Sequence, residues 1–117
     1  TWQAAEGALM VPNTLVCHIE ANARALLSAE RPALNFLQLL SAVASKARTY
    51  ADAIAGTGAQ VVDTRKTLPG LRQAQKYAVR VGGGSNQRLA LWHGILIKEN
   101  HIAAAGGIAP VLAQASA

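Results

Sequence analysis

The chain has 117 residues, 51% of them hydrophobic, which suffices for one folded domain and excludes the polar bias of a disordered protein. Eleven Lys and Arg against six Asp and Glu give a formal charge of +5, so some face or cleft should attract nucleic acid or phosphorylated metabolites. The apolar residues are mainly aliphatic, which favours an α/β fold over an aromatic-rich β-sandwich.

The sequence gives no sign of a membrane or an oxidising compartment. No stretch approaches the roughly 20 consecutive apolar residues of a membrane span, and residues 1–20 lack a basic start followed by an apolar core. Cys17 is the one cysteine, so it has no internal disulfide partner and no second sulfur for a metal pair. We therefore expect a cytoplasmic, unprocessed protein without membrane contact.

The first half of the chain predicts two short strands and a long helix. Apolar residues 9–11 and 15–19, separated by Pro12 and Asn13, are typical of strand, turn and strand. From about residue 28 to 54 apolar side chains recur at spacings of four and three, which predicts one helix: Phe36, Leu40, Val43, Ala47, Tyr50 and Ile54. Pro32 suits the first turn of that helix.

The second half alternates between strands and helices. Residues 60–64 predict a buried parallel strand, and a helix opened by Thr67 and Pro69 follows until Gly82-Gly83-Gly84 breaks it. A second buried strand is predicted at 94–97, with short helices at 99–105 and 109–116. This order predicts a parallel sheet with right-handed crossovers. Two strands close no barrel, so we expect an excerpt of a larger subunit.

Cations follow both predicted buried strands. Arg65 and Lys66 follow the first, and Lys98 follows the second, at the strand ends where parallel α/β folds bind ligands. Unpaired charge beside a buried strand is costly unless an anion or an acid compensates it. For Arg65 and Lys66 two interpretations stay open at this point, namely an anionic ligand or an ion pair with Asp63 or Glu99.

The loop at residues 82–88 adds a further cation, Arg88. Its glycines would let backbone N–H groups approach a ligand, although the loop matches neither a P-loop nor a dinucleotide fingerprint. A helix stop with a flexible connection is the alternative interpretation. Arg31 likewise has the alternative of a solvated surface arginine.

Other kinds of site have little support. The three histidines, His18, His93 and His101, have no metal-binding spacing, so no metal site is expected among these residues. The basic residues are dispersed among apolar ones, which argues against a nucleic-acid-binding tail.

Three segments resemble the central signature of quinolinate phosphoribosyltransferases: DTRKTLPGLR at 63–72, KYAV at 76–79 and GGG at 82–84. Upstream, AERPALNFL at 29–37 resembles the linking helix of the family. Downstream, LIKENHI at 96–102 resembles its next strand end. Order and spacing agree from about residue 16 to 117.

The resemblance implies an architecture and a reaction. Residues 1–27 would end an α/β sandwich domain, 28–54 would form the linking helix, and 55–117 would begin an open α/β barrel. The implied subunit is a homodimer that converts quinolinate and phosphoribosyl pyrophosphate to nicotinate mononucleotide, pyrophosphate and carbon dioxide in NAD biosynthesis. Mg²⁺ is the implied cofactor, with its acidic ligands expected outside this sequence.

The resemblance also implies residue roles. Arg65, Arg88 and Lys98 would converge in one pocket and hold the quinolinate carboxylates. Thr64 and Lys66 would lie beside them toward the phosphoribosyl group, with Lys66 and Lys98 as the candidate catalytic residues.

Two further positions follow from the resemblance. Arg31 would reach across the dimer interface into the neighbouring site. Gln87 stands where the family usually has a histidine, and it can donate a hydrogen bond but cannot carry charge. The alternatives are a homologue on the same scaffold with another substrate, of the molybdenum-associated type, and a non-catalytic basic module that binds nucleic acid or other anions.

Overall fold

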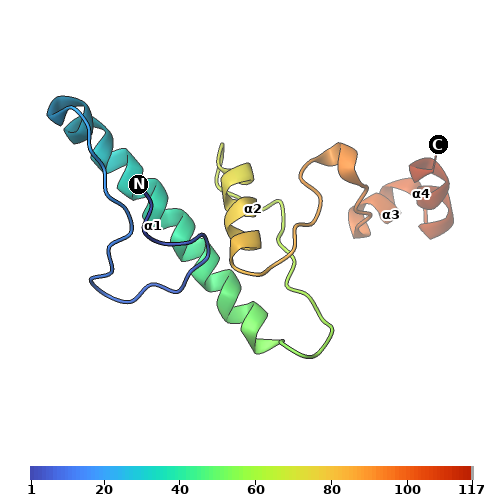
Figure 1. The fold of residues 1–117 in the computed structure, drawn as a ribbon. Helices are drawn as coiled ribbons and strands as arrows, with labels where there is room; N and C mark the ends of the chain where they lie inside the picture. The colour runs from blue at the N-terminus through green and yellow to red at the C-terminus, as the bar shows by residue number, and fades with distance from the viewer. Residues whose placement is uncertain (117) are drawn as a thin grey trace. The chain divides into compact units, whose positions relative to one another are not determined.

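The structure of the chain, a computed structural model, describes residues 1–116, which belong to two compact units, Thr1–Gln87 and Arg88–Ala117. The first unit contains helices α1 (Ala23–Ala53) and α2 (Arg72–Val81) (Figure 1). The second contains a short 3₁₀ helix (Leu91–His93) followed by α3 (Glu99–Ala105) and α4 (Ile108–Ala115).

The segment before α1 doubles back on itself without forming regular strands. One antiparallel bridge joins Trp2 to Cys17, and the His18 N–H donates to the Thr1 carbonyl at 2.8 Å. Leu9 is 95% exposed. The strands predicted at 9–11 and 15–19 are therefore wrong apart from this bridge, because a strand needs neighbours that pair its backbone and cover its apolar face.

Helix α1 begins five residues before the predicted start. Asn22 caps it, since its side-chain oxygen accepts from the backbone N–H groups of Arg24 at 3.1 Å and Ala25 at 3.3 Å. Pro32 consequently lies inside the helix rather than in its first turn. A proline there has no N–H for the carbonyl of Ser28 four residues earlier, and the rest of the helix continues around this single lost bond.

Helix α2 begins at Arg72, later than Thr67 and Pro69 suggested, and ends where the glycines predicted. Residues 67–71 form a turn in which the Leu71 N–H donates to the Leu68 carbonyl at 3.1 Å. The Gln75 side chain accepts from the Leu68 N–H at 2.8 Å and so ties this turn to the helix. The turn brings Thr67 close to the start of α2.

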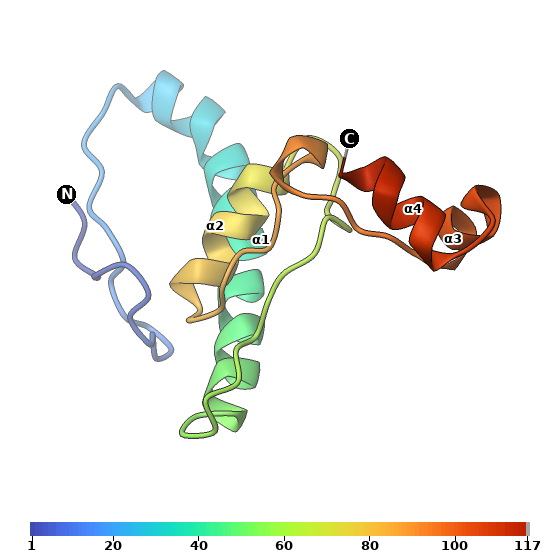
Figure 2. The ribbon, with the colours of Figure 1, turned by 90° about the vertical axis from the view of Figure 1, so that its right-hand side faces the viewer.

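Helices α1 and α2 lie side by side (Figure 2) and pack against each other. The residues buried in their contact are small. Ala47 on α1 and Ala78 on α2 are buried, whereas Phe36 is 51% exposed. The approach is closest at Gly82, where a Cβ atom would lie 2.2 Å from the Ala44 carbonyl oxygen and 2.7 Å from the Ala47 Cβ. The contact therefore depends on a position without a side chain.

We expect Gly82→Ala to lower the free energy of unfolding by about 1–3 kcal/mol, the range for inserting atoms into a packed contact. Gly82 has an ordinary φ of −74°, so the cost is steric and not conformational. Gly56→Ala is the matched control, because Gly56 has a φ of +80° but open space around its Cβ position. Urea unfolding of both variants measures the two costs separately, and an unchanged Gly82→Ala midpoint would contradict the packing argument.

The strand predicted at residues 60–64 is reduced to one parallel bridge between Val62 and Ser85. The Ser85 N–H donates to the Val61 carbonyl at 2.8 Å, and the Asp63 N–H donates to the Ser85 carbonyl at 3.1 Å. Val62 is 54% exposed whereas the Asp63 side chain is 7% exposed, so alternate residues are covered and the prediction of a fully buried strand is wrong for the residues described. The bridge nevertheless fixes the segment before Thr64 against the end of the glycine loop.

The second unit confirms the predicted helices at 99–105 and, within a residue, at 109–116. Helix α3 ends at Gly106, whose φ of 83° is the left-handed conformation that glycine adopts without strain. Helix α4 packs against α3 and buries Val111. Residues 94–97 form no strand, and Ile95 is 69% exposed, so the second predicted strand is wrong.

Candidate anion site

The carboxylate of Asp63 is the centre of the polar interactions in the first unit. It forms an ion pair with Lys76, accepts from the Asn86 side-chain amide at 2.5 Å and accepts from the Gln87 backbone N–H at 2.8 Å. The Lys76 and Asp63 side chains are only 5% and 7% exposed. We call these four residues, Asp63, Lys76, Asn86 and Gln87, the Asp63 network.

The remaining bonds of the Asp63 network lead back to the backbone. Lys76 Nζ also donates to the Gln87 carbonyl at 3.1 Å, and the Asn86 amide donates to the Lys76 carbonyl at 2.9 Å. Both backbone groups of Gln87 are therefore held. The sequence suggested that Asp63 would pair with Arg65 or Lys66, and this alternative is wrong, because Lys76 holds it. No local pattern indicates a pair 13 residues apart that joins an extended segment to the middle of a helix.

Side-chain exposure alternates along residues 61–67, as it does along an extended segment. Asp63, Arg65 and Thr67 are partly buried, whereas Thr64 and Lys66 are exposed. Within the part of the chain that the structure describes, Arg65 Nε is buried without a hydrogen-bond partner. Such a donor costs about 1–3 kcal/mol. The described residues therefore leave this Arg65 donor without an acceptor.

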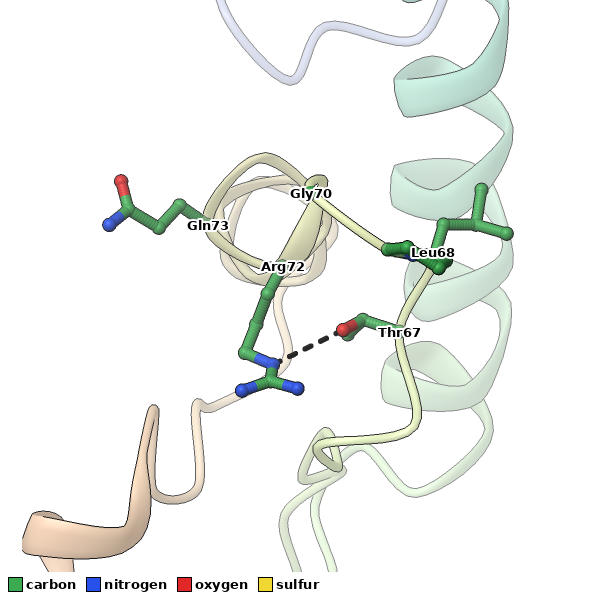
Figure 3. Close-up of a pocket in the computed structure, with 6 residues that line it drawn as sticks. Thr67, Leu68, Gly70, Arg72 and Gln73 are labelled. Atoms are coloured by element: carbon green, nitrogen blue, oxygen red, sulfur yellow. Dashed lines mark hydrogen bonds between the residues drawn. The ribbon is translucent and has the colours of Figure 1, made fainter.

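Arg72, the first residue of α2, holds the backbone that carries Arg65. Its Nε donates to the Thr67 hydroxyl at 3.2 Å, and its Nη2 donates to the Arg65 carbonyl at 3.4 Å. Figure 3 shows the Arg72 side chain extended toward Thr67, with Gln73 pointing away from this loop. Arg72 borders a pocket of about 500 Å³ that the turn before α2 forms, lined by Thr67, Leu68, Pro69, Gly70, Arg72 and Gln73.

A second pocket, of about 190 Å³, brings two predicted residues to the Asp63 network. Thr64 and Lys66 line it together with Asp63 and Lys76, and the rest of its wall is apolar or neutral: Val43, Thr67, Gln75 and Val79. The Lys76 charge is balanced by Asp63, so Lys66 leaves the pocket wall with a net positive charge. This charge suits a small anion.

The glycine loop is not a cradle of free N–H groups. The N–H groups of residues 82–85 donate to carbonyls of Ala78, Arg80, Val79 and Val61 at 2.8–3.0 Å. Gly83 has a left-handed φ of 89°, and a Cβ on Gly84 would lie 2.7 Å from Val79 Cγ1. The expectation that these backbone groups approach a ligand is therefore wrong. The glycines end α2 and permit close packing.

The second unit holds two further predicted residues. Arg88 Nη1 donates to the Gly94 carbonyl at 2.9 Å. Lys98 precedes α3, and its backbone N–H donates to His101 Nδ1 at 3.0 Å. Arg65 belongs to the other unit, so the convergence of Arg65, Arg88 and Lys98 stays a prediction. The roles of Gln87 and of Arg31, which is exposed on α1, stay predictions as well.

The described residues contain neither a cluster of metal ligands nor a helix that could span a membrane. Among residues 1–116 no three or more His, Cys, Asp or Glu side chains gather where they could hold a metal ion. In the same residues no helix has the length and apolar character that crossing a membrane requires.

Sequence models of one family match two consecutive parts of the chain. The N-terminal domain of quinolinate phosphoribosyl transferase matches residues 1–41, and its C-terminal domain matches residues 43–117. The chain belongs to the quinolinate phosphoribosyltransferase family. The resemblance carried by the segments at 63–72, 76–79 and 82–84 is thus confirmed.

Individual relatives support the same family. It is 47% identical over 111 residues to the nicotinate-nucleotide pyrophosphorylase (carboxylating) of Mycobacterium leprae, covering 95% of this chain and 39% of the relative. The probable enzyme of that name from Bacillus subtilis is 45% identical over 103 residues, covering 88% of this chain and 36% of the relative. The chain therefore spans less than two fifths of the length of these relatives.

Solved structures support the fold. The NadC crystal structure from Streptococcus pyogenes superposes with a TM-score of 0.90 at 48% identity, covering 97% of this chain and 40% of that one. The nicotinate-nucleotide pyrophosphorylase from Francisella tularensis gives a TM-score of 0.92 at 44% identity, covering 99% and 41%. These neighbours are consistent with the predicted α/β class.

Proposed function

We propose that this chain forms part of a quinolinate phosphoribosyltransferase subunit, which transfers the phosphoribosyl group of phosphoribosyl pyrophosphate to quinolinate and releases pyrophosphate and carbon dioxide. The observation that carries the proposal is the buried, unpartnered Nε of Arg65 within the signature segment. The adjoining pocket, with its uncompensated Lys66, supports it. The names of the relatives give the reaction.

The chemistry suits these residue types. Quinolinate carries two carboxylates, and a guanidinium binds a carboxylate with paired hydrogen bonds whereas an ammonium acts as a point charge. We assign Arg65, Arg88 and Lys98 to the carboxylates, and Thr64, Lys66 and Gln87 to positions beside them. Cations at such a site also offset the negative charge that develops as pyrophosphate leaves, which is the role proposed for Lys66 and Lys98.

The bond changes need no acid or base from the chain. The pyridine nitrogen bonds to the sugar carbon while the bond from that carbon to pyrophosphate breaks. The ring nitrogen is then cationic, so it stabilises the electron pair that stays on the adjacent ring carbon as carbon dioxide leaves. A proton from solvent replaces the carboxylate.

The finer architecture belongs to the same proposal. Residues 1–27 would complete an α/β sandwich, 28–54 link it, and 55–117 begin an open barrel, in a cytoplasmic homodimer. Mg²⁺ is proposed for the full-length subunit only, because the described residues hold no suitable ligand group. We therefore derive no step through it.

We expect Arg65→Ala to weaken quinolinate binding by about 1.5–3 kcal/mol, because it removes a charged hydrogen-bond donor. The measurement is calorimetric titration of a full-length subunit that contains this sequence. Arg80→Ala is the control, since Arg80 is exposed and stacks on Tyr77, with its guanidinium carbon 5.9 Å from the ring centroid. If the wild-type subunit binds no quinolinate, the proposed function is wrong. If the wild type binds quinolinate and Arg65→Ala has the same affinity as Arg80→Ala, the role of Arg65 is wrong.

A further inference from the structure

We propose that Lys76 is a positioning residue of the candidate anion site, which holds Gln87 against the segment that carries Thr64, Arg65 and Lys66. The inference rests on the proposed function. Lys76 itself binds no substrate in this proposal. It acts through the Asp63 network.

The first argument is the set of bonds that Lys76 makes. Its Nζ pairs with the Asp63 carboxylate and donates to the Gln87 carbonyl at 3.1 Å, and the same carboxylate accepts the Gln87 N–H at 2.8 Å. Asp63 and Gln87 are 24 residues apart in the chain. The ammonium group thus adds a third point of attachment, beside the Val62–Ser85 bridge and the bond from Gln87 N–H to Asp63, between two segments that both contain proposed substrate residues.

The second argument is that Lys76 is held and its charge is already used. Lys76 is 4% exposed and lies in the middle of α2, which packs on α1. Its positive charge faces a carboxylate at contact distance, so it has little attraction left for a substrate anion. Arg65 and Lys66, in contrast, lie two and three residues beyond Asp63 and keep a donor and a charge for a ligand.

The third argument is energetic. A buried ion pair is a poor source of stability, because desolvation of both charges offsets their attraction, and apolar pairs of similar volume often serve as well. Apolar contacts, unlike hydrogen bonds, do not specify the direction in which two groups face each other. The bonds of Lys76 to the Asp63 carboxylate and the Gln87 carbonyl set the position of one segment relative to the other. A site assembled from separate segments needs this relative position to be fixed.

The test compares Lys76→Met with Lys46→Met in the full-length subunit. Lys46 is exposed on α1, with its Nζ 5.1 Å from the centre of the Tyr50 ring, so the control removes the same charge away from the site. Quinolinate affinity is measured by calorimetry at a temperature where circular dichroism shows each variant folded. Lys76→Met should raise the Kd about tenfold or more, and the control should stay within about twofold.

A double variant, Asp63→Asn with Lys76→Met, separates positioning from stability. It removes both buried charges, so the melting temperature should recover toward the wild-type value. Quinolinate affinity should not recover, because the Gln87 carbonyl still lacks the Lys76 ammonium as its hydrogen-bond donor. Recovery of both quantities, or wild-type affinity in a folded Lys76→Met subunit, would overturn the inference. Absence of quinolinate binding by the wild type would instead overturn the proposed function, and this inference with it.

Discussion

Asp63→Ala is expected to lower the free energy of unfolding by about 3–5 kcal/mol, the range for removing one partner of a buried ion pair. The substitution leaves the Lys76 ammonium at 4% exposure without a counter-charge. It also removes one of the two acceptors of the Asn86 amide and the acceptor of the Gln87 N–H. Urea denaturation followed by circular dichroism measures the loss, and a chain of low initial stability would unfold outright.

Two comparisons show whether the buried charge causes this loss. Asp52→Ala removes a carboxylate from the exposed last turn of α1 and should change the unfolding free energy by less than about 0.5 kcal/mol. Asp63→Asn keeps an oxygen that accepts from Gln87, so its cost should fall between the two. Equal costs for Asp63→Ala and Asp52→Ala would mean that the Asp63 network contributes nothing to stability.

The sequence predicted the elements whose causes are local. Three consecutive glycines end α2 because they favour a stop within one turn, and the end of α3 follows from the Gly106 that closes it. The start of α1 was missed although its signal was present, since Asn22 is a favourable capping residue. Pro32 misled the prediction because a proline is common in a first turn but tolerated later at the cost of one bond.

The strand predictions failed for a non-local reason. β-Branched runs such as residues 60–64 suit a strand only if neighbouring strands pair with them, and among the described residues one bridge to Ser85 is the pairing found. The same reasoning covers residues 9–11, 15–19 and 94–97. Composition specifies that a segment can be extended, but its pairing depends on residues elsewhere.

The residues of the candidate site also divide into those that the sequence identified from local patterns and those that only long-range contacts reveal. Arg65, Lys66 and Thr64 were found because they are contiguous and the signature around them is specific. Lys76 and Asn86 were not singled out, because their importance comes from contacts with Asp63 over 13 and 23 residues of sequence. A charged residue in a short helix gives no sign in the sequence that it is nearly fully buried.

Arg31 raises the question of whether one subunit can complete its site alone. It is exposed on α1, 34 positions before Arg65. The family resemblance assigns it to the neighbouring subunit's site, and in a twofold dimer each subunit would lend its arginine to the other. The helix that carries it is long enough to present a side chain well away from the α1–α2 contact, which lies near Ala44 and Ala47.

We expect full-length Arg31→Ala and Arg88→Ala subunits each to be nearly inactive, because every site in either homodimer lacks one arginine. Mixing equal amounts should restore activity. In a mixed dimer one site combines the intact Arg88 of one subunit with the intact Arg31 of the other, while the second site lacks both. Random exchange makes half of the dimers mixed, so pyrophosphate release should approach roughly a quarter of the wild-type rate.

A mixture of Arg65→Ala and Arg88→Ala subunits is the control. Both of these residues are assigned to the subunit's own site, so no mixed dimer contains an intact site and activity should stay low. If mass spectrometry shows subunit exchange and the Arg31→Ala mixture remains at the level of the single variants, Arg31 does not act across the interface.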